Sequence, residues 1–253
     1  MSETPTPISN PTTALLYFDD AELYTANASV LDVRISTEGD TQLILDRTIF
    51  YPQGGGQPFD LGTVQTENSV FEIESVRFAD GFVLHNGNFR SGNIKVGEAV
   101  DLKIDVERRV LNAKNHTAGH LIDAAMANCN FNFTPTKGYH FPDSPYVEYN
   151  GMIEADDREA AMEKLDAELA RLISTGGKVE ALLVDSYADL KDYCQFVPAY
   201  VPKDKPVRVV RVAGLGCPCG GTHMSEISDL VSVKVSKIKS KSGNVRIGYQ
   251  VQD

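Results

Sequence analysis

Two short pairs of metal-ligating residues, roughly a hundred positions apart, constrain the fold of this chain most. The first pair is His116 and His120, and the second is Cys219 and His223. Residues four positions apart on a helix project from the same face, and neutral imidazole and thiolate are ligands that zinc prefers. The sequence therefore predicts that the fold joins both pairs in one zinc site, with one ion per chain.

The role of this predicted zinc ion stays open at this stage. Four protein ligands are typical of a closed structural site, whereas a catalytic site keeps a position for water. Cys217 is a spare thiol that could replace a ligand or pack against the loop. Position 117 holds Thr, not the Glu of a His-Glu-x-x-His peptidase, so the general base of a peptidase is missing. We therefore expect chemistry on an activated ester.

Length and composition favour two domains in the cytoplasm. The chain has 253 residues, which is more than one ordinary core holds. No apolar run reaches the roughly 20 residues that span a bilayer, so no membrane association is expected. The first residues do not resemble a signal peptide. The four cysteines are too few for a disulfide framework and are expected to be free thiols or ligands. The oligomeric state stays open.

Charge is distributed unevenly along the chain. The net charge is −11, with 5 basic against 15 acidic residues in positions 1–102 and 19 against 20 in positions 103–253. The stretch from Lys234 to Arg246 holds five basic residues and no acidic one. This end of the chain could bind a polyanion, or it could be a solvated strand face.

The first hundred residues predict a disordered end and a small all-β domain. Residues 1–12 are rich in Ser, Thr and Pro and are expected to be disordered. Residues 13–104 show short alternating strands with close turns, at positions 38–40, 80–81, 86–88 and 91–93, which favours a small barrel or a sandwich. The expected strands are 30–36, 41–46, 70–78, 82–85 and 100–104.

One loop of this region contains Gly54, Gly55 and Gly56, followed by Gln57. Three consecutive glycines inside a fold are entropically costly, so they indicate positive φ angles or a close backbone approach. The loop could present its N–H groups to a ligand, or it could be a wide turn between strands. It is not a phosphate loop, because no Lys-Ser/Thr follows it.

The composition changes near residue 105, and residues 105–253 predict an α+β domain with an antiparallel sheet. Helical periodicity begins at 106, and a second helix is expected from about 156 to 176. The expected strands are 179–184, 207–212, 230–239 and 245–251. Between the helices, Tyr139 and Phe141 could stack on a nucleotide base or pack in the core.

Four stretches, in this order, resemble the editing domain of alanyl-tRNA synthetase and the free-standing AlaX-type trans-editing proteins. They are residues 50–58, 115–120, 219–223 and 241–247. The resemblance implies a medium-length family form. Its fold would be an N-terminal β-barrel like the second domain of elongation factors, followed by an α+β editing domain. It also implies zinc ligands at His116, His120, Cys219 and His223.

The resemblance further implies hydrolysis of tRNA(Ala) mischarged with serine, and in some members glycine. A pocket sized for alanine discriminates by only about 1–3 kcal/mol, so a second site must remove errors. We expect backbone N–H groups of Gly54–Gly56 or of the zinc loop to stabilise the oxyanion. Gln57 and Thr117 could contact the serine hydroxyl, although Thr117 could instead bond its own helix. Lys137 belongs to the segment that could meet the terminal adenosine.

Three questions stay open in this interpretation. The sequence shows no protein base, so the tRNA ribose hydroxyl or a second water could carry the proton. Gly119, between the two helical histidines, either lets another element pack closely or loosens the site. The competing functions are a tRNA-binding protein with a structural zinc and no activity, and a zinc hydrolase of another small ester or amide.

Overall fold

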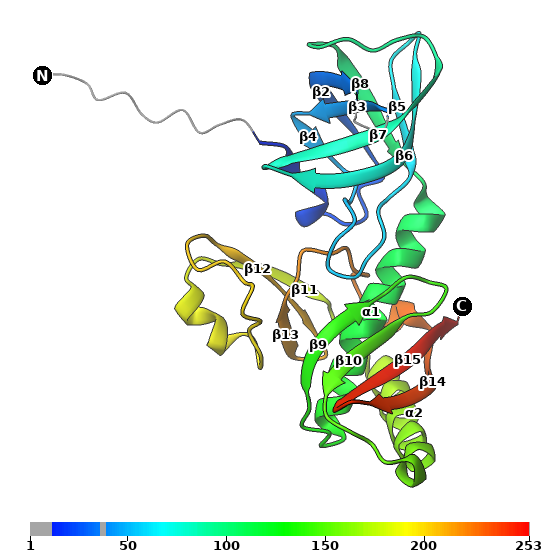
Figure 1. Ribbon diagram of the computed structural model, residues 1–253, viewed down its shortest axis with the longest axis vertical. Helices are drawn as coiled ribbons and strands as arrows, with labels where there is room; N and C mark the ends of the chain where they lie inside the picture. The colour runs from blue at the N-terminus through cyan, green and yellow to red at the C-terminus, as the bar shows by residue number, and fades with distance from the viewer. Residues whose placement is uncertain (1–11, 36–38, 253) are drawn as a thin grey trace, which may run out of the picture. The chain divides into compact units, whose positions relative to one another are not determined.

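The computed structural model describes residues 12–35 and 39–252, which form two compact units (Figure 1). The first unit comprises the chain up to Pro52 together with Phe59–Asp105, and the second comprises Gln53–Pro58 and Val106–Asp253. Except for residue 12, the segment expected to be disordered lies outside the described residues. The six residues of the glycine loop thus belong to the unit that contains the expected zinc ligands.

A closed antiparallel barrel forms most of the first unit, and it agrees with the barrel alternative over the sandwich. Its strand order is β2-β3-β7-β6-β5-β8. Closure leaves no strand edge open for pairing with another chain. The strands are β2 (Thr25–Ile35), β3 (Thr41–Leu45), β5 (Gly62–Gln65), β6 (Val70–Ala79), β7 (Phe82–Ser91) and β8 (Ala99–Ile104). Two short strands, β1 (Ala14–Leu15) and β4 (Arg47–Thr48), pair in parallel beside them.

The turn expected at residues 86–88 is wrong, because these residues lie inside β7. A β-carbon at Gly87 would clash with the backbone carbonyl of Glu72 on the paired strand β6. The register of this pair shifts between Ile73 and Ser75. Gly87 therefore marks a close backbone approach beside a bulge, which sequence alone does not distinguish from a turn.

A buried histidine makes the stability of the barrel depend on pH. His85 is fully buried, with Nδ1 3.0 Å from the carbonyl of Leu43 and Nε2 2.8 Å from the hydroxyl of Thr48. Burial lowers the pKa of His85 to about 4, although the bond to Leu43 acts in the opposite direction. Below pH 6.5 His85 therefore binds a proton in the unfolded chain but stays neutral in the folded barrel. The barrel loses stability as the pH falls towards 4.

We expect the barrel to lose about 2 kcal/mol of unfolding free energy between pH 7 and pH 5 through His85. Urea unfolding, followed by hydrogen exchange of peptides from β3 and β7, measures this loss. The variant His85→Gln should be less stable at pH 7 but should lack this part of the pH dependence. An identical pH dependence in the two proteins would contradict the assignment to His85.

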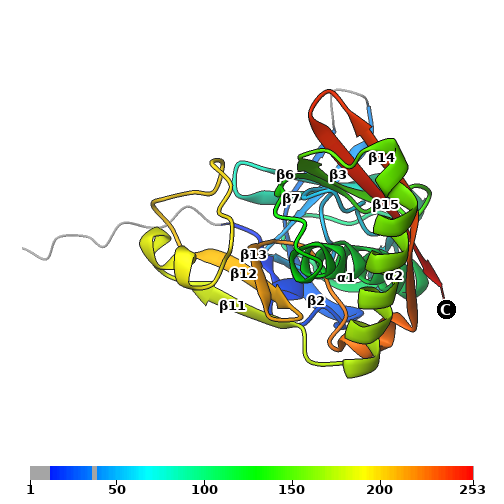
Figure 2. The same cartoon turned by 90° about the horizontal axis from the view of Figure 1, so that it is seen from below.

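The second unit contains two long helices and two antiparallel sheets, in agreement with the expected α+β architecture. The helices are α1 (Val106–Asn128) and α2 (Arg158–Thr175), and Figure 2 shows them beside each other with β14 and β15 along them. The larger sheet has the order β14-β15-β10-β9 and the smaller one β11-β12-β13. The strands are β9 (Thr134–Tyr139), β10 (Tyr146–Asn150), β11 (Glu180–Val184), β12 (Val207–Val212), β13 (Leu215–Pro218), β14 (Ser232–Lys241) and β15 (Asn244–Gln252).

One apolar core joins the helices of the second unit to the larger sheet. Leu121 of α1, Leu165 of α2 and Ile247 of β15 are fully buried in it. Alternate residues of β10 and β15 point into this core, so the opposite face of the sheet is free of core contacts. The sheet thus has an inner face towards α1 and an outer face towards solvent.

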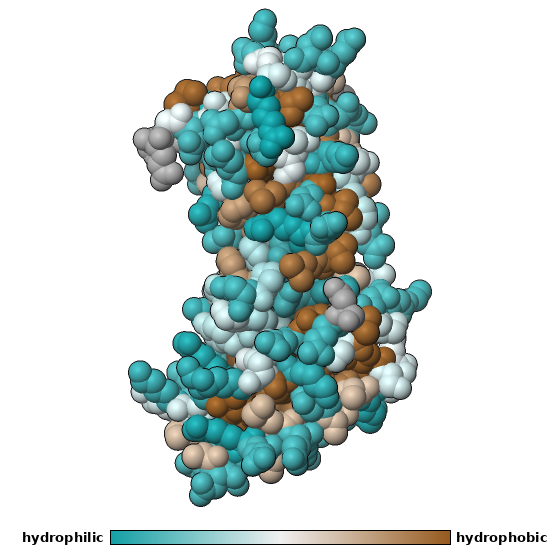
Figure 3. All heavy atoms as spheres, turned by 90° about the vertical axis from the view of Figure 1, so that its right-hand side faces the viewer, coloured by the Kyte–Doolittle hydropathy of each residue, from teal (hydrophilic) through white to brown (hydrophobic). Residues whose placement is uncertain are grey.

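Three strands of the second unit were not expected from the sequence. Strand β9 reads Thr-Pro-Thr-Lys-Gly-Tyr and has no apolar alternation, because it is an edge strand. Strand β10 has five residues, and β13 lies in a Gly-Cys-Pro segment that favours a loop. On the face drawn in Figure 3, hydrophilic residues predominate between smaller apolar patches. Within the described chain, no helix is long and apolar enough to cross a membrane.

Candidate metal centre

Four side chains from α1 and from the loop after β13 meet in the second unit. One ligand atom from each of His116, His120, Cys219 and His223 lies within 4.8 Å of all the others. The Cys219 sulfur is 3.4 Å from Nε2 of His116 and 3.7 Å from Nε2 of His223. Tetrahedral zinc bonds of about 2.3 Å to sulfur and 2.0–2.1 Å to nitrogen place such atoms roughly 3.5 Å apart. The spacing therefore fits a tetrahedral ion.

The protonation states of this cluster also suit a metal ion. Burial lowers the pKa of His120 to about 4 and those of His116 and His223 well below the ordinary value, so all three imidazoles are neutral. Nε2 of His120 is buried and has no hydrogen-bond partner among the described residues. Burial raises the pKa of the Cys219 thiol, although the Gly221 N–H at 3.4 Å lowers it. A bound cation would favour the thiolate.

Cys217 lies outside this cluster. Its side chain belongs to β13, where Cys217 pairs with Val210, and its sulfur is 3.6 Å from the carbonyl of Pro218. Burial raises the pKa of the Cys217 thiol far above its usual range. In this structure the Cys217 sulfur is thus not one of the four clustered ligand atoms.

Gln57 connects the two halves of the centre. Its Oε1 accepts from the N–H of Thr222 at 3.0 Å and lies 2.8 Å from Nδ1 of His116, and its Nε2 donates to the Thr222 hydroxyl at 2.8 Å. Because Oε1 is an acceptor, Nδ1 of His116 carries the proton and Nε2 is left for a metal. The amide is fully buried, and both its oxygen and its nitrogen are bonded within the centre. Contact between Gln57 and the substrate hydroxyl stays a prediction.

Removing this support should weaken metal binding. In Gln57→Leu, Nδ1 of His116 loses its acceptor, and we expect zinc affinity to fall by roughly 10–100-fold. Competition with a chelating dye measures the affinity. Gln53→Leu, at an exposed position of the same loop, is the control and should bind zinc normally. Equal zinc affinities in both variants would contradict the orienting role of Gln57.

Thr117 also has a different role from contact with a substrate hydroxyl. Its hydroxyl donates to the carbonyl of Ala113 at 2.8 Å and accepts from the N–H of Met224 at 3.0 Å. The side chain is fully buried. Thr117 therefore bonds its own helix, as the alternative stated, and it also fixes the segment that follows His223.

The glycine loop makes a tight turn that packs against β9. The N–H and carbonyl of Gly54 bond the carbonyl and N–H of Gln57, at 3.2 and 2.8 Å. Gly55 and Gly56 have φ angles of +53° and +80°, as the central residues of a type I′ turn require. The Gly56 carbonyl accepts from the N–H of His140 at 2.8 Å, and a β-carbon there would clash with the carbonyl of Gly138. The loop is both a turn and a close approach.

Only part of this turn can serve an incoming ligand. The N–H of Gly54 is used by the turn itself. Within the described residues, the N–H groups of Gly55 and Gly56 have no hydrogen-bond partner. Within the glycine loop, the N–H groups of Gly55 and Gly56 are therefore the remaining candidate donors to an oxyanion.

His140 is part of the centre, a place that its sequence neighbourhood does not predict. Its ring stacks on His116, with centroids 4.4 Å apart and planes 21° apart. Its Nδ1 is 2.7 Å from the Tyr249 hydroxyl, which donates to the carbonyl of Asn115 at 2.8 Å. A β-carbon at Gly119 would clash with the His140 ring. Gly119 therefore allows the His140 ring to pack closely against α1. In the sequence, a glycine between two metal ligands was the one sign that another side chain packs there.

Asp123 lies on the far side of His120 from the cluster. Its carboxylate is 3.8 Å from Nδ1 of His120 and accepts from the Tyr149 hydroxyl at 2.6 Å. Burial raises the pKa of Asp123 to about 7, and the bond from Tyr149 opposes this rise. A carboxylate on the Nδ1 side leaves Nε2 of His120 facing the other ligands.

Comparison with known proteins points to one family. Residues 9–108 match the family model of tRNA synthetases class II (A). The chain is 30% identical, over 91% of its length, to the alanyl-tRNA editing protein AlaX-L of Pyrococcus horikoshii. The chain is thus similar to an AlaX-type alanyl-tRNA editing protein. The resemblance seen in the four sequence stretches is thereby confirmed.

Alanine–tRNA ligases are further relatives. The chain is 30% identical to that of Methanobrevibacter smithii over 96% of its length and 30% identical to that of Halobacterium salinarum over 89%. It spans 55% of the AlaX-L protein and 27% and 24% of these two ligases. The conclusions from these alignments therefore concern the shared region.

Lys137 does not point towards the metal centre. Lys137 is exposed on β9, opposite Glu148, and alternation along the strand directs it to the outer face while His140 points inwards. Tyr139 and Phe141 are half-buried, stacked with centroids 4.5 Å apart, and lie outside the described core clusters. Core packing, one of their two alternatives, is therefore not what the structure shows.

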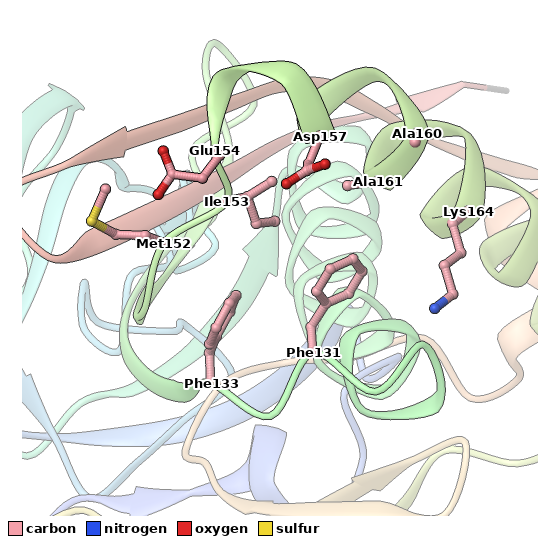
Figure 4. Close-up of a pocket in the computed structure, with 9 residues that line it drawn as sticks. All are labelled: Phe131, Phe133, Met152, Ile153, Glu154, Asp157, Ala160, Ala161 and Lys164. Carbon is pink, nitrogen blue, oxygen red and sulfur yellow. The ribbon is translucent and has the colours of Figure 1, made fainter.

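A hollow of about 330 Å³ lies elsewhere in the second unit (Figure 4). Phe131, Phe133 and Ile153 line it together with charged side chains such as Glu154 and Asp157, but none of the four cluster residues does. Lys164 at its rim donates to the carbonyl of Cys129 at 2.7 Å and lies over the Phe131 ring. Because none of the four clustered ligand residues lines this hollow, it is not the candidate site.

Proposed function

We propose that this chain hydrolyses the ester bond of mischarged tRNA(Ala), with Ser-tRNA(Ala) as the main substrate and Gly-tRNA(Ala) as a second. The observation that carries this proposal is the cluster of three neutral imidazoles and Cys219, held through Gln57 by the glycine turn. Kinship with alanyl-tRNA editing proteins supports the choice of substrate. We further propose that the two compact units are the two domains and that editing takes place in the cytoplasm.

Each part of the centre has a proposed task. Zinc, held by His116, His120, Cys219 and His223, would supply a Lewis acid that activates water or polarises the ester. Gln57 keeps the His116 imidazole in the required orientation. The unpaired N–H groups of Gly55 and Gly56 would donate to the developing oxyanion.

The proton carrier in this proposal comes from outside the protein. The carboxyl group of Asp123 is half-buried and accepts from the Tyr149 hydroxyl, and the hydroxyl of Thr117 is already used by Ala113 and Met224. We therefore assign the proton to the tRNA ribose hydroxyl or to a second water. An ester has a better leaving group than an amide, so it needs less help than a peptide.

Deacylation of tRNA(Ala) charged with serine, glycine or alanine tests the function. We expect the zinc-loaded protein to release serine at least a hundredfold faster than alanine, because an editor must spare the correct product. Release of none of the three amino acids by zinc-loaded protein would overturn the enzymatic function. Equal release of alanine and serine would overturn editing and favour a general esterase.

The four-ligand cluster also favours one competing function, a tRNA-binding protein with a structural ion, since four protein ligands are typical of closed zinc sites. Such a protein would bind tRNA(Ala) and unfold on loss of zinc without releasing any amino acid. The editing proposal expects release by the loaded protein, so the same assay decides between them.

A further inference from the structure

We infer that the outer face of the sheet β14-β15-β10-β9 binds single-stranded RNA, namely the unpaired 3′ end of the tRNA before it enters the metal centre. The identity of this RNA rests on the proposed function. The inference itself rests on the charge and the stacked side chains of a surface that lies outside the centre.

Basic residues dominate this outer face, although the whole chain has a net charge of −11. The outward-facing strand residues include six basic and one acidic side chain, all except Glu148 exposed. They are Lys137, Glu148, Lys234, Lys237, Lys239, Lys241 and Arg246. Arg246 pairs with Glu148 at 2.5 Å and Lys234 lies 3.7 Å from Asp166 of α2, so four lysines carry the unpaired charge among these residues. Strand register places Lys239, Arg246, Glu148 and Lys137 in one row across the sheet. Such a concentration of charge complements a phosphate backbone.

The same face carries a continuous stack of planar groups. The Arg246 guanidinium lies 4.7 Å from the centre of the Tyr146 ring. Tyr146 stacks with Tyr139 at 5.4 Å and 19°, and Tyr139 stacks with Phe141 at 4.5 Å and 12°. All three aromatic rings are half-buried. Aromatic rings and guanidinium planes on an exposed sheet are the surfaces on which single-stranded bases stack.

This combination favours single-stranded RNA over other polyanions. An anionic lipid surface or an acidic protein would use the lysines but has no need of the stack. A duplex hides its base faces, so it could not use the stack either. Gly248 lies between Lys237 and Tyr146 in the register and has no side chain that could cover the Tyr146 ring.

Strand β9 connects the outer face to the metal centre, because the residue that follows it, His140, belongs to the centre. This strand is the edge of the sheet, and its residues alternate between the two faces. Tyr139 points outwards, whereas its neighbour His140 points inwards and stacks on His116. The stack and the centre are therefore joined by two consecutive residues, Tyr139 and His140.

Binding of a short RNA to the zinc-loaded full chain tests the inference. The probe is a fluorescein-labelled single strand of about eight nucleotides that ends in CCA, measured by anisotropy. We expect Tyr139→Leu and Tyr146→Leu each to weaken binding about tenfold. Lys239→Gln with Lys241→Gln should weaken it and reduce the slope of log affinity against log salt by about 1.4.

A matched control comes from another part of the same unit. Lys203 lies over the ring of Tyr187, 5.4 Å from its centre, so Tyr187→Leu with Lys203→Gln removes one aromatic residue and one lysine as well. This variant should bind the RNA within twofold of the original protein. Zinc content and the thermal midpoint of every variant show whether its fold is kept.

Several outcomes would overturn the inference. They are loss of binding in the control variant to the same degree, equal affinity for an abasic strand, and binding of anionic phospholipid vesicles but not RNA. A small substrate, 3′-O-seryl adenosine, separates this inference from the proposed function. Hydrolysis of Ser-tRNA(Ala) without RNA binding by the outer face would refute only the RNA-binding inference. RNA binding without hydrolysis of either ester would refute only the proposed hydrolysis.

Discussion

Replacing Cys219 with Ala is expected to reduce hydrolysis of Ser-tRNA(Ala) about a thousandfold. The Cys219 sulfur lies 3.4 and 3.7 Å from two of the cluster imidazoles, so its loss removes the one anionic ligand of the set. A loss of about 4 kcal/mol of transition-state stabilisation corresponds to this factor. Single-turnover deacylation and metal analysis of the same samples measure rate and zinc content together.

Cys217→Ala is the matched control, because it removes a thiol two positions away from the same loop. Cys217 lies in β13 and is not a member of the cluster. We expect this variant to keep its zinc and its rate within twofold. The assignment of the ligands would be wrong if Cys217→Ala lost zinc and activity while Cys219→Ala kept them.

The second large effect is expected for Gly119→Ala. Helix propensity alone predicts that this change stabilises the protein, whereas we expect it to destabilise the protein. In a helix interior, Ala is favoured over Gly by about 1 kcal/mol. At position 119 the added β-carbon would clash with the His140 ring and lie 3.1 Å from the Tyr249 hydroxyl. We expect Gly119→Ala to destabilise the second unit by about 1–3 kcal/mol. It should also slow deacylation roughly a hundredfold, because a displaced His140 disturbs the His116 ring on which it stacks.

A double-mutant cycle with His140→Ala isolates the cause. Removing the His140 ring gives the new β-carbon space, so Gly119→Ala should be neutral or stabilising in that background. Urea unfolding of the four proteins, with hydrogen exchange of α1 peptides, measures the coupling. If Gly119→Ala raised stability with His140 in place, the close packing of these two residues would be refuted.

The metal cluster could be predicted because ligand chemistry leaves few choices. His116 and His120 share a helix face whatever the tertiary structure, and only a nearby thiolate and imidazole complete a zinc-type set. Long elements such as α1 and β15 were found for a similar reason, since their periodicity or alternation spans many residues.

The roles of single polar residues could not be predicted in the same way. Gln57 and Thr117 both lie in the centre, but the sequence does not show which partners use up their hydrogen-bonding atoms. Strand β9 was missed because an edge strand needs no apolar alternation, and with it the place of His140 was missed. These features depend on which distant segments meet, and only tertiary structure supplies that information.

Zinc titration of the metal-free protein tests the central claim most directly. With Ser-tRNA(Ala) as substrate, we expect deacylation to rise in proportion to added zinc and to level off at one ion per chain. Cys219→Ala should show no such rise over the same range. Full activity in the metal-free protein, or a plateau reached equally by Cys219→Ala, would contradict a hydrolytic centre built on these four residues.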